Sequence, residues 1–239
     1  MPQAQLHVEL LAHTPEPEKT CALAARTCYS GMEYEELKAL VGEKDQSAFL
    51  RRITASGHLS VLEHASFTFF VSGVSRSLLA QITRHRIASF SVQSQRYVSL
   101  AEGFGYIIPP RILALGEDAV REFENQMAQM QAWYVGWQEK LGSGEGGNED
   151  ARFVLPNACE THITLTMNAR ELLHFFSLRC CSRAQWEIRA LAQEMLRLCK
   201  RVAPVIFESA GPGCVCGPCP EGAKSCGKAQ QIRELYKNL

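Results

Sequence analysis

The residues best suited to chemistry lie in one stretch of the chain, residues 84–97, with the sequence RHRIASFSVQSQRY. This stretch holds Arg84, Arg86 and Arg96, and residues 64–101 around it contain no Asp, Glu or Lys. An arginine guanidinium forms paired, charge-assisted hydrogen bonds with phosphate oxygens, each contributing about 1.5 to 3 kcal/mol. The composition therefore predicts a site for a phosphate-bearing nucleotide. The alternative is a solvated helix end whose arginines pair with surface carboxylates.

The order of the residues is more specific than their charge. An Arg-His-Arg triplet, seven residues and then Ser-x-Arg-Tyr resembles the signature of the flavin-dependent thymidylate synthases. The resemblance covers about residues 1–208 and continues through Ala24, Ala25, Arg26, Gly57, His58, Glu63, His64, Phe67, Thr68, Phe69, Arg152, Val154, Leu155, Pro156, Asn168, Ala169, Arg170, Leu178, Arg179, Ala184, Gln185, Trp186 and Glu187. This spread disfavours the surface-charge alternative.

The resemblance implies an enzyme that methylates dUMP to dTMP. Its cofactor would be FAD, with NADPH as the reductant and methylene-tetrahydrofolate as the carbon donor. It also implies a homotetramer whose active sites are shared between subunits, so that residues 84–86 and 92–96 serve pockets from different chains. Whether NADPH or another donor such as ferredoxin reduces the flavin is left open.

Particular residues inherit roles from the resemblance. It implies dUMP binding by Gln81, Ile82, Thr83, Arg84, Val92, Gln93, Ser94, Gln95, Arg96, Arg152 and Arg179. It implies FAD binding by Ser60, Arg84, His85, Arg86, Asn168, Ala169, Arg170 and His174. Arg179 is implied to be the principal catalytic residue, since a fixed cation stabilises negative charge that develops on uracil. Its structural alternative is a charge that favours a helix C-terminus.

Other chemistry in the same residues has weaker support. His58 and His85 could transfer protons, although a lone histidine is more often a hydrogen-bonded packing residue. Ser94 would need an activating base to act as a nucleophile, so a binding role is favoured. Three residues depart from the family's pattern: His174 replaces a familiar asparagine, Arg183 replaces a histidine and Cys28 replaces a serine.

Composition excludes several classes of protein. The 239 residues are 46% hydrophobic and 21% charged, which is typical of a globular protein. No export signal and no apolar run of about 18 residues is visible, so we expect a cytoplasmic protein with reduced cysteines. Because 25 basic residues balance 25 acidic ones, no partnership with nucleic acid or membrane is expected. An RNA-binding module using the arginines with Phe90 or Tyr97 remains the alternative.

The C-terminal segment has its own character. Residues 1–208 are predicted to form the catalytic domain, and residues 209–239 a tail rich in Cys, Gly and Pro. Within the tail, Cys214, Cys216, Cys219 and Cys226 have a spacing that could bind zinc or an iron-sulfur cluster. The alternatives are redox-labile or simply packed thiols. A scaffold protein that has lost catalysis is a third class, which the intact residues 84–97 disfavour.

Periodicity predicts an α+β fold, a single domain in which an antiparallel sheet is flanked by helices. Strands are expected at residues 6–10, 66–74 and 161–166, and helices at 16–25, 34–41, 47–55, 75–86, 117–141, 150–154, after 168 and up to about 201. Ser75 and Asn168 are expected helix caps, with Glu171 paired to Asn168. Capping pairs are also expected at Ser60 with Glu63 and at Ser182 with Gln185. Residues 142–147 are expected to form a loop.

Overall fold

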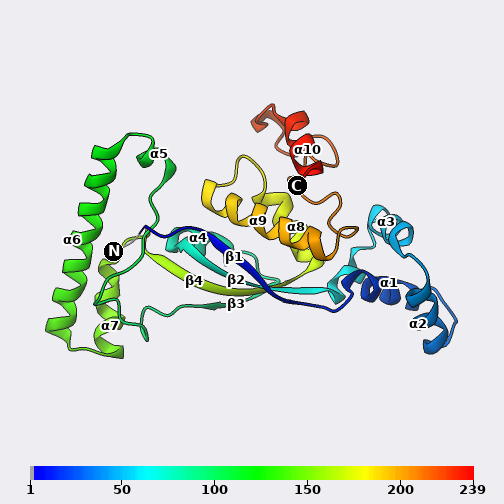
Figure 1. Ribbon diagram of the computed structural model, residues 1–239, viewed down its shortest axis with the longest axis horizontal. Coiled ribbons are helices and arrows are strands. Elements are labelled where there is room, and N and C mark those ends of the chain that lie inside the picture. Colours follow the sequence, from blue (N-terminus) through cyan, green and yellow to red (C-terminus); the bar gives the residue numbers. More distant parts are fainter. Residues whose placement is uncertain (1–2) are drawn as a thin grey trace. The chain divides into compact units, whose positions relative to one another are not determined.

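The structure, a computed structural model, describes residues 3–239. Its four-stranded sheet has the order β1-β2-β4-β3 (Figure 1), with β1 (His7–His13), β2 (Ser66–Ser75), β3 (Ala88–Val92) and β4 (Glu160–Asn168). On β2 and β4 the residue numbers run in opposite directions, because Thr68 contacts Thr166 while the amide of Gly73 donates to Glu160. The predicted antiparallel α+β fold is confirmed. β3 was not predicted.

The helices account for most of the remaining ordered chain. They are α1 (Pro17–Thr27), α2 (Tyr34–Glu43), α3 (Ser47–Ala55), α4 (Arg76–Ile82), α5 (Pro110–Leu113), α6 (Glu117–Leu141), α7 (Glu145–Ala151), α8 (Ala169–Arg179), α9 (Trp186–Val202) and α10 (Ala229–Lys237). Short 3-10 segments are η1 (Leu59–His64), η2 (Arg152–Val154) and η3 (Gly222–Lys224). The bounds of α6 are those predicted, and α1, α2 and α3 lie within two residues of prediction.

Several element predictions were wrong. The helix capped by Ser75 ends at Ile82 and not at Arg86, since the residues after Ile82 supply no further apolar face. Part of the expected loop at 142–147 belongs to α7, which forms despite its glycines because Asn148 and Ala151 are buried. Gln185 alone caps α9, accepting from the amides of Glu187 and Ile188. The Ser60 and Glu63 pair makes no cap at η1.

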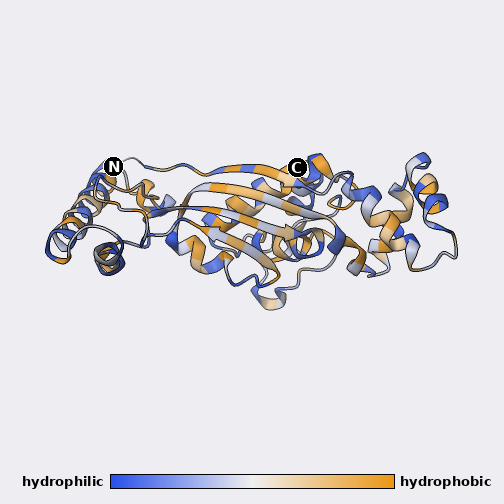
Figure 2. Ribbon diagram, turned by 90° about the horizontal axis from the view of Figure 1, so that it is seen from below, coloured by the Kyte–Doolittle hydropathy of each residue, from blue (hydrophilic) through white to orange (hydrophobic). Residues whose placement is uncertain are grey.

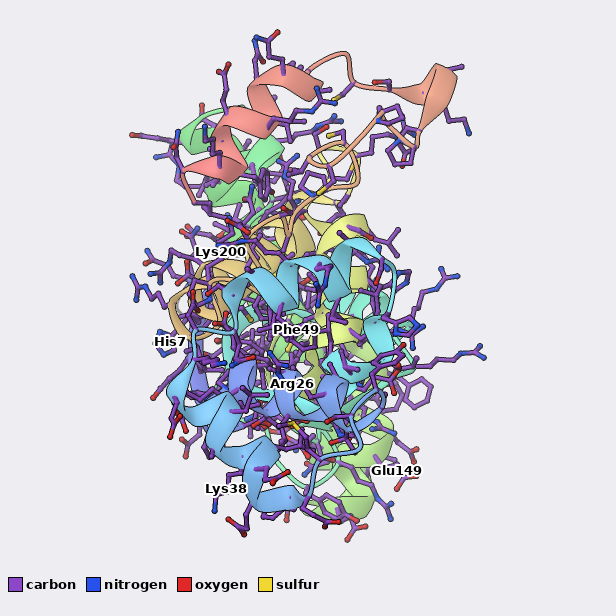
Figure 3. The ribbon with its side chains drawn as sticks, turned by 90° about the vertical axis from the view of Figure 1, so that its right-hand side faces the viewer. His7, Arg26, Lys38, Phe49, Glu149 and Lys200 are labelled. Atoms are coloured by element: carbon purple, nitrogen blue, oxygen red, sulfur yellow. The ribbon has the colours of Figure 1, made fainter. Side chains whose placement is uncertain are left out.

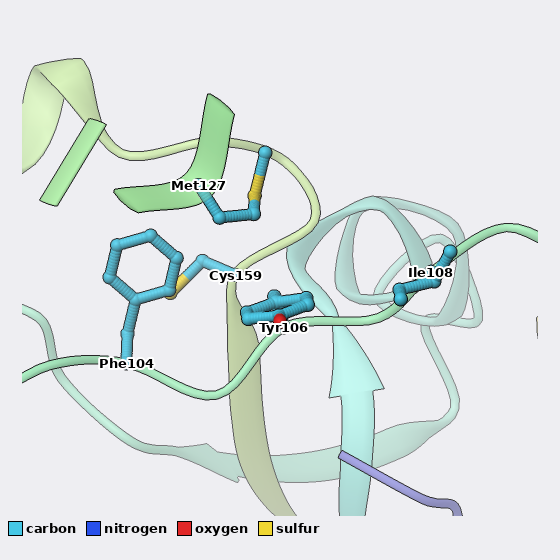
Figure 4. Packing of buried hydrophobic residues seen from close by; sticks show 5 residues of the cluster. All are labelled: Phe104, Tyr106, Ile108, Met127 and Cys159. Atoms are coloured by element: carbon cyan, nitrogen blue, oxygen red, sulfur yellow. The ribbon is translucent and has the colours of Figure 1, made fainter. Parts of the chain in front are cut away.

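The chain divides into two compact units, each made from several segments. Unit 1 comprises Met1–His7, Phe70–Arg84 and Phe90–Thr164, and unit 2 comprises Val8–Phe69, His85–Ser89 and Leu165–Leu239. Unit 1 has an apolar cluster that Figure 4 shows, formed by Phe104, Tyr106, Ile108, Met127 and Cys159. This cluster packs the loop before α5 against α6 and against the residue that precedes β4.

Three buried phenylalanine rings contact one another in the core of unit 2. Phe207 meets Phe67 edge-on at 5.4 Å and Phe176 at 6.0 Å, and all three side chains are fully buried. These contacts join β2 and α8 to the segment after α9, so the helix that ends at Arg179 has a rigid base.

The side chain of Arg26 connects two N-terminal helices of unit 2. The guanidinium of Arg26, in α1, lies 4.3 Å from the centre of the Phe49 ring, and the two labelled side chains lie together in Figure 3. The same guanidinium donates to Gln46 Oε1, at the start of α3. Arg26, one of the residues behind the family resemblance, therefore has a structural role in this chain.

Long α6, in unit 1, leaves apolar side chains exposed. Figure 2 shows hydrophilic and hydrophobic residues mixed along this helix. Trp133, Trp137 and Leu141 follow one another at intervals of four residues and are 52%, 46% and 47% exposed. Side chains at this spacing share one helix face, so they form an apolar stripe. Within residues 3–239, no helix combines the length and apolarity needed to span a membrane.

The C-terminal segment folds onto α9 in unit 2. The buried hydroxyl of Tyr236, in α10, donates to the carbonyl of Cys180 and accepts from Gln193 Nε2. Lys200 donates to the Tyr236 carbonyl at 2.7 Å. The segment is therefore ordered by specific contacts, and one of them lies directly after Arg179.

Tyr236→Phe is expected to lower the free energy of unfolding by about 1 to 3 kcal/mol. The change leaves the Cys180 carbonyl and the Gln193 amide without their buried partner. Urea unfolding of both proteins measures the difference. Tyr34→Phe is the control, because the Tyr34 side chain is 59% exposed. An equal effect of the two substitutions would show that the Tyr236 hydroxyl contributes nothing.

Candidate functional site

The two sets of predicted ligand residues divide between the compact units. All predicted dUMP residues except Arg179 belong to unit 1, and all predicted FAD residues except Arg84 belong to unit 2.

Two arginines predicted to bind dUMP come together in unit 1. Arg96 forms ion pairs with Glu145 at 2.5 Å and with Glu149 at 2.8 Å, both in α7. Arg152 Nε donates to the carbonyl of Glu149 at 3.0 Å. Asn148 Nδ2 also donates to the carbonyl of Arg96, so that α7 contacts both the side chain and the backbone of Arg96. Residues 64–101 contain no carboxylate of their own, but α7 supplies two to Arg96, so its charge is neutralised within the fold.

The backbone of residues 92–96 is held in place by its neighbours in unit 1. Arg76 Nη2 donates to the Gln93 carbonyl at 2.8 Å, and the Gln93 amide donates to the His162 carbonyl. Burial lowers the pKa of Arg76, as does the nearby charge of Arg152. Sequence reasoning did not assign Arg76 to the site. Its place in the stretch without carboxylates was the signal that could have done so.

Ser94 forms a turn with the residues that follow it. Its Oγ accepts from the amides of Arg96 and Tyr97 at 3.2 and 3.3 Å. A serine nucleophile is instead activated by a base that accepts its proton. The turn contacts leave the hydroxyl proton available to a ligand, which agrees with a binding role.

The end of α4 presents one cation to solvent. Ile82 is fully buried, so only its backbone could meet a ligand, while Arg84 is exposed. Among residues 3–239, neither Arg84 nor Arg86, which is also exposed, has a hydrogen bond or ion pair to the protein. These two arginines keep the unneutralised charge that the sequence predicted.

In unit 2, η1 and the start of α8 bring several predicted FAD residues together. The Ala169 amide donates to the Ala65 carbonyl, and Arg170 forms an ion pair with Glu63 at 2.5 Å. Ser60 lies in η1 and is exposed. Asn168 caps α8, its Oδ1 accepting from the Glu171 amide at 2.9 Å, as predicted.

Asn168→Ala is expected to destabilise the fold by about 1 kcal/mol, because the first turn of α8 loses its cap. Asn168→Asp keeps an acceptor oxygen and should be close to neutral. Thermal unfolding of the three proteins without ligands separates this contribution from any contact to FAD. Equal melting temperatures of Asn168→Ala and the unsubstituted protein would exclude the capping role.

A largely buried polar group of unit 2 surrounds His85. His85 Nδ1 lies 2.9 Å from Glu171 Oε1, and Arg179 Nε donates to His85 Nε2 at 3.0 Å. The exposed ring of His174 lies 6.0 Å from the ring of His85. Glu171 was predicted only as the partner of the Asn168 cap. Its carboxylate contacts His85 instead, a contact between residues 86 positions apart that no local pattern could indicate.

The tail cysteines do not gather into a metal site. Within the described part of the chain, no group of three or more His, Cys, Asp or Glu side chains is placed to hold a metal ion. Cys216 Sγ donates to the Ser209 carbonyl. The residues therefore do not fit zinc or an iron-sulfur cluster in this conformation.

The unusual Arg183 has a clear structural partner in the tail. Its Nη1 donates to the Lys224 carbonyl at 3.0 Å, and its Nε pairs with Glu221 at 3.2 Å. Arg183 thus binds the C-terminal segment.

Comparison with known proteins shows extensive similarity. The sequence model of the thymidylate synthase complementing protein family matches residues 9–205. The flavin-dependent thymidylate synthase of Geobacter sulfurreducens is 53% identical over 235 residues, covering 98% of this chain and 99% of the relative. The enzyme of Clostridium tetani is 48% identical, with 96% of each chain covered.

A solved structure shares the fold. The flavin-dependent thymidylate synthase of Helicobacter pylori, crystallised with FAD and dUMP, superposes with a TM-score of 0.63 at 27% identity. The match covers 86% of this chain and 99% of that one.

Proposed function

Because the chain belongs to the thymidylate synthase complementing protein family, the flavin-dependent thymidylate synthases, we propose that it converts dUMP to dTMP with bound FAD. Methylene-tetrahydrofolate is the proposed carbon donor and NADPH the proposed reductant. The structure of the Helicobacter pylori relative contains FAD and dUMP, which supports both ligands here.

The observation that carries the proposal is the contrast among the arginines. Arg96 and Arg170 have carboxylate partners, whereas Arg84 and Arg86 are exposed and unpaired within the described chain. Exposed guanidinium groups without carboxylates can pair with phosphates. We assign Arg86 to the FAD pyrophosphate and Arg84 to both ligands. The resident groups therefore fit a flavin nucleotide.

In unit 1, the turn at Ser94 and the neighbouring Arg152 provide the dUMP site. The Ser94 hydroxyl donates to phosphate or sugar, and Arg152 supplies positive charge. Arg96 keeps the turn in place through its ion pairs with α7, and it contacts the nucleotide from that position. Gln81, the backbone of Ile82, Thr83, Val92, Gln93 and Gln95 complete the proposed dUMP set.

Arg179 is the proposed catalytic residue. Its proposed role is to stabilise the negative charge that grows on the uracil ring during the reaction, an effect that requires a preorganised cation. When bound, FAD supplies the hydride. His85 does not act as a proton carrier in this account, because both ring nitrogens already have protein partners.

We propose that the active protein is a homotetramer with shared active sites. The exposed stripe of Trp133, Trp137 and Leu141 on α6 supports association, since apolar patches on a surface mark contact sites. Mixing Arg179→Ala chains with Ser94→Ala chains should restore partial activity in co-assembled tetramers, because some sites then receive both native residues. Activity no higher than that of either variant would contradict shared sites.

The proposed location is the cytoplasm, without partnership to nucleic acid or membrane. The zero net charge supports this, because it gives no general attraction to polyanions.

Turnover with single omissions tests the function. Purified protein should form dTMP from dUMP only when FAD, methylene-tetrahydrofolate and a reductant are all present. Replacing NADPH by reduced ferredoxin tests the electron donor. No dTMP with either reductant would contradict the proposal. Salt-dependent RNA affinity in a protein that takes up no flavin would favour the RNA-binding module instead.

A further inference from the structure

His85 is held in a single protonation form by its two neighbours. An arginine Nε is always a donor, so His85 Nε2, which it contacts at 3.0 Å, must present a lone pair. The proton therefore lies on Nδ1, which donates to Glu171 Oε1 at 2.9 Å. The contacts thus define a neutral ring with one donor and one acceptor, each aimed at a different charged residue.

The environment of His85 favours this neutral form. The His85 and Glu171 side chains are only 4% and 7% exposed. Burial lowers the pKa of His85, and the charges of Arg179 and His174 act in the same direction against the opposing effect of Glu171. At neutral pH the ring therefore keeps the lone pair that accepts from Arg179.

Further contacts fix the positions of Glu171 and His85. Glu171 lies in the first turn of α8, where its amide is bound by the Asn168 cap. The buried ring of Phe175 meets His85 edge-on at 5.0 Å. His85 thus links the first turn of α8 to Arg179, the last residue of the same helix.

We propose that Glu171 and His85 are positioning residues that fix the plane of the Arg179 guanidinium for its action on the uracil ring. The inference rests on the proposed function, because Arg179 is catalytic only in that account. The bond at Nε limits rotation of the guanidinium, and a guanidinium must be oriented in advance to stabilise developing charge. Neither positioning residue needs to touch dUMP.

Two substitutions of His85 distinguish the effect of its hydrogen-bond acceptor from the effect of the space that its ring fills. In His85→Gln, the side-chain carbonyl can still accept from Arg179 Nε, whereas His85→Leu fills space without an acceptor. We expect His85→Leu to lower kcat about 10- to 100-fold, since small displacements of a catalytic group have effects of this size. His85→Gln should retain kcat within about fivefold of the unsubstituted protein. His13 is an exposed histidine outside the site, so His13→Ala is the control for the loss of one histidine.

A double-substitution cycle tests whether His85 acts through Arg179. If it does, adding His85→Leu to Arg179→Ala should change kcat less than about threefold further, because residues acting as a unit are not additive. Full additivity would overturn the proposal. Loss of FAD affinity in His85→Leu with unchanged kcat at saturating FAD would also overturn it, since it would make His85 a cofactor contact.

A spectroscopic measurement tests the contact between His85 and Arg179 without requiring turnover. In protein labelled with 15N-arginine, the Arg179 Nε–H signal is assigned by its loss in Arg179→Lys. This hydrogen should exchange slowly with solvent in the unsubstituted protein. It should become fast in His85→Leu and stay protected in His85→Gln. Equal exchange in all three would contradict the positioning contact. This result can be obtained whether or not the chain forms dTMP, so it distinguishes failure of the contact from failure of the function.

Discussion

Arg179→Ala is expected to lower kcat for dTMP formation by about 10²- to 10³-fold. This is the usual effect of removing one preorganised group that stabilises charge in a transition state. The KM for dUMP should change much less, because the interaction strengthens as the reaction proceeds. Steady-state kinetics at saturating FAD measures both values.

Arg179→Lys is the matched variant. Lysine keeps the charge but lacks the planar guanidinium and its Nε donor to His85. We expect it to recover only a small part of the lost kcat. A lysine variant with full activity would show that charge alone suffices, and the orientation given by His85 would then be irrelevant. Arg201→Ala, at the far end of α9, is the control for the loss of one arginine.

Gly73→Ala should have the largest effect on stability. Gly73 in β2 has φ of 67°, and a Cβ there would lie 1.8 Å from the Gln5 carbonyl oxygen. Backbone atoms must move to relieve this clash, and the left-handed conformation adds strain. We expect a loss of about 3 kcal/mol or more in the free energy of unfolding.

Gly136→Ala is expected to change the free energy of unfolding in the opposite direction. Gly136 lies within α6, and a Cβ would meet no atom within 4 Å. Alanine should therefore stabilise the helix by up to about 1 kcal/mol. Urea unfolding of both variants gives the comparison. If Gly73→Ala is as stable as the unsubstituted protein, the close approach of β2 to Gln5 is not a feature of the folded chain.

Local patterns predicted the parts of the fold that local physics determines. The caps at Ser75 and Asn168 and the full length of α6 follow from side chains within a few residues of one another. Strand β3 was missed because residues 88–92 alternate serine with larger side chains and form their strand only by pairing with β4. That pairing partner is distant in the sequence.

At the candidate site, too, contacts between residues distant in the sequence could not be predicted. The sequence signature predicts which residues bind the nucleotides, but not which contacts hold those residues in place. Glu145 and Glu149, which pair with Arg96, come from a segment read as a glycine-rich loop and the residues after it. Glu171 was read only for its cap spacing, because its contact with His85 depends on the folded chain.

The most direct test of the proposed function is the visible absorption spectrum of the purified protein with FAD, recorded before and after addition of dUMP. We predict a bound-flavin spectrum that shifts when dUMP is added, because the two ligands would then occupy one site. An absence of flavin binding would contradict the account, and it would mean that Arg84 and Arg86 serve another anion.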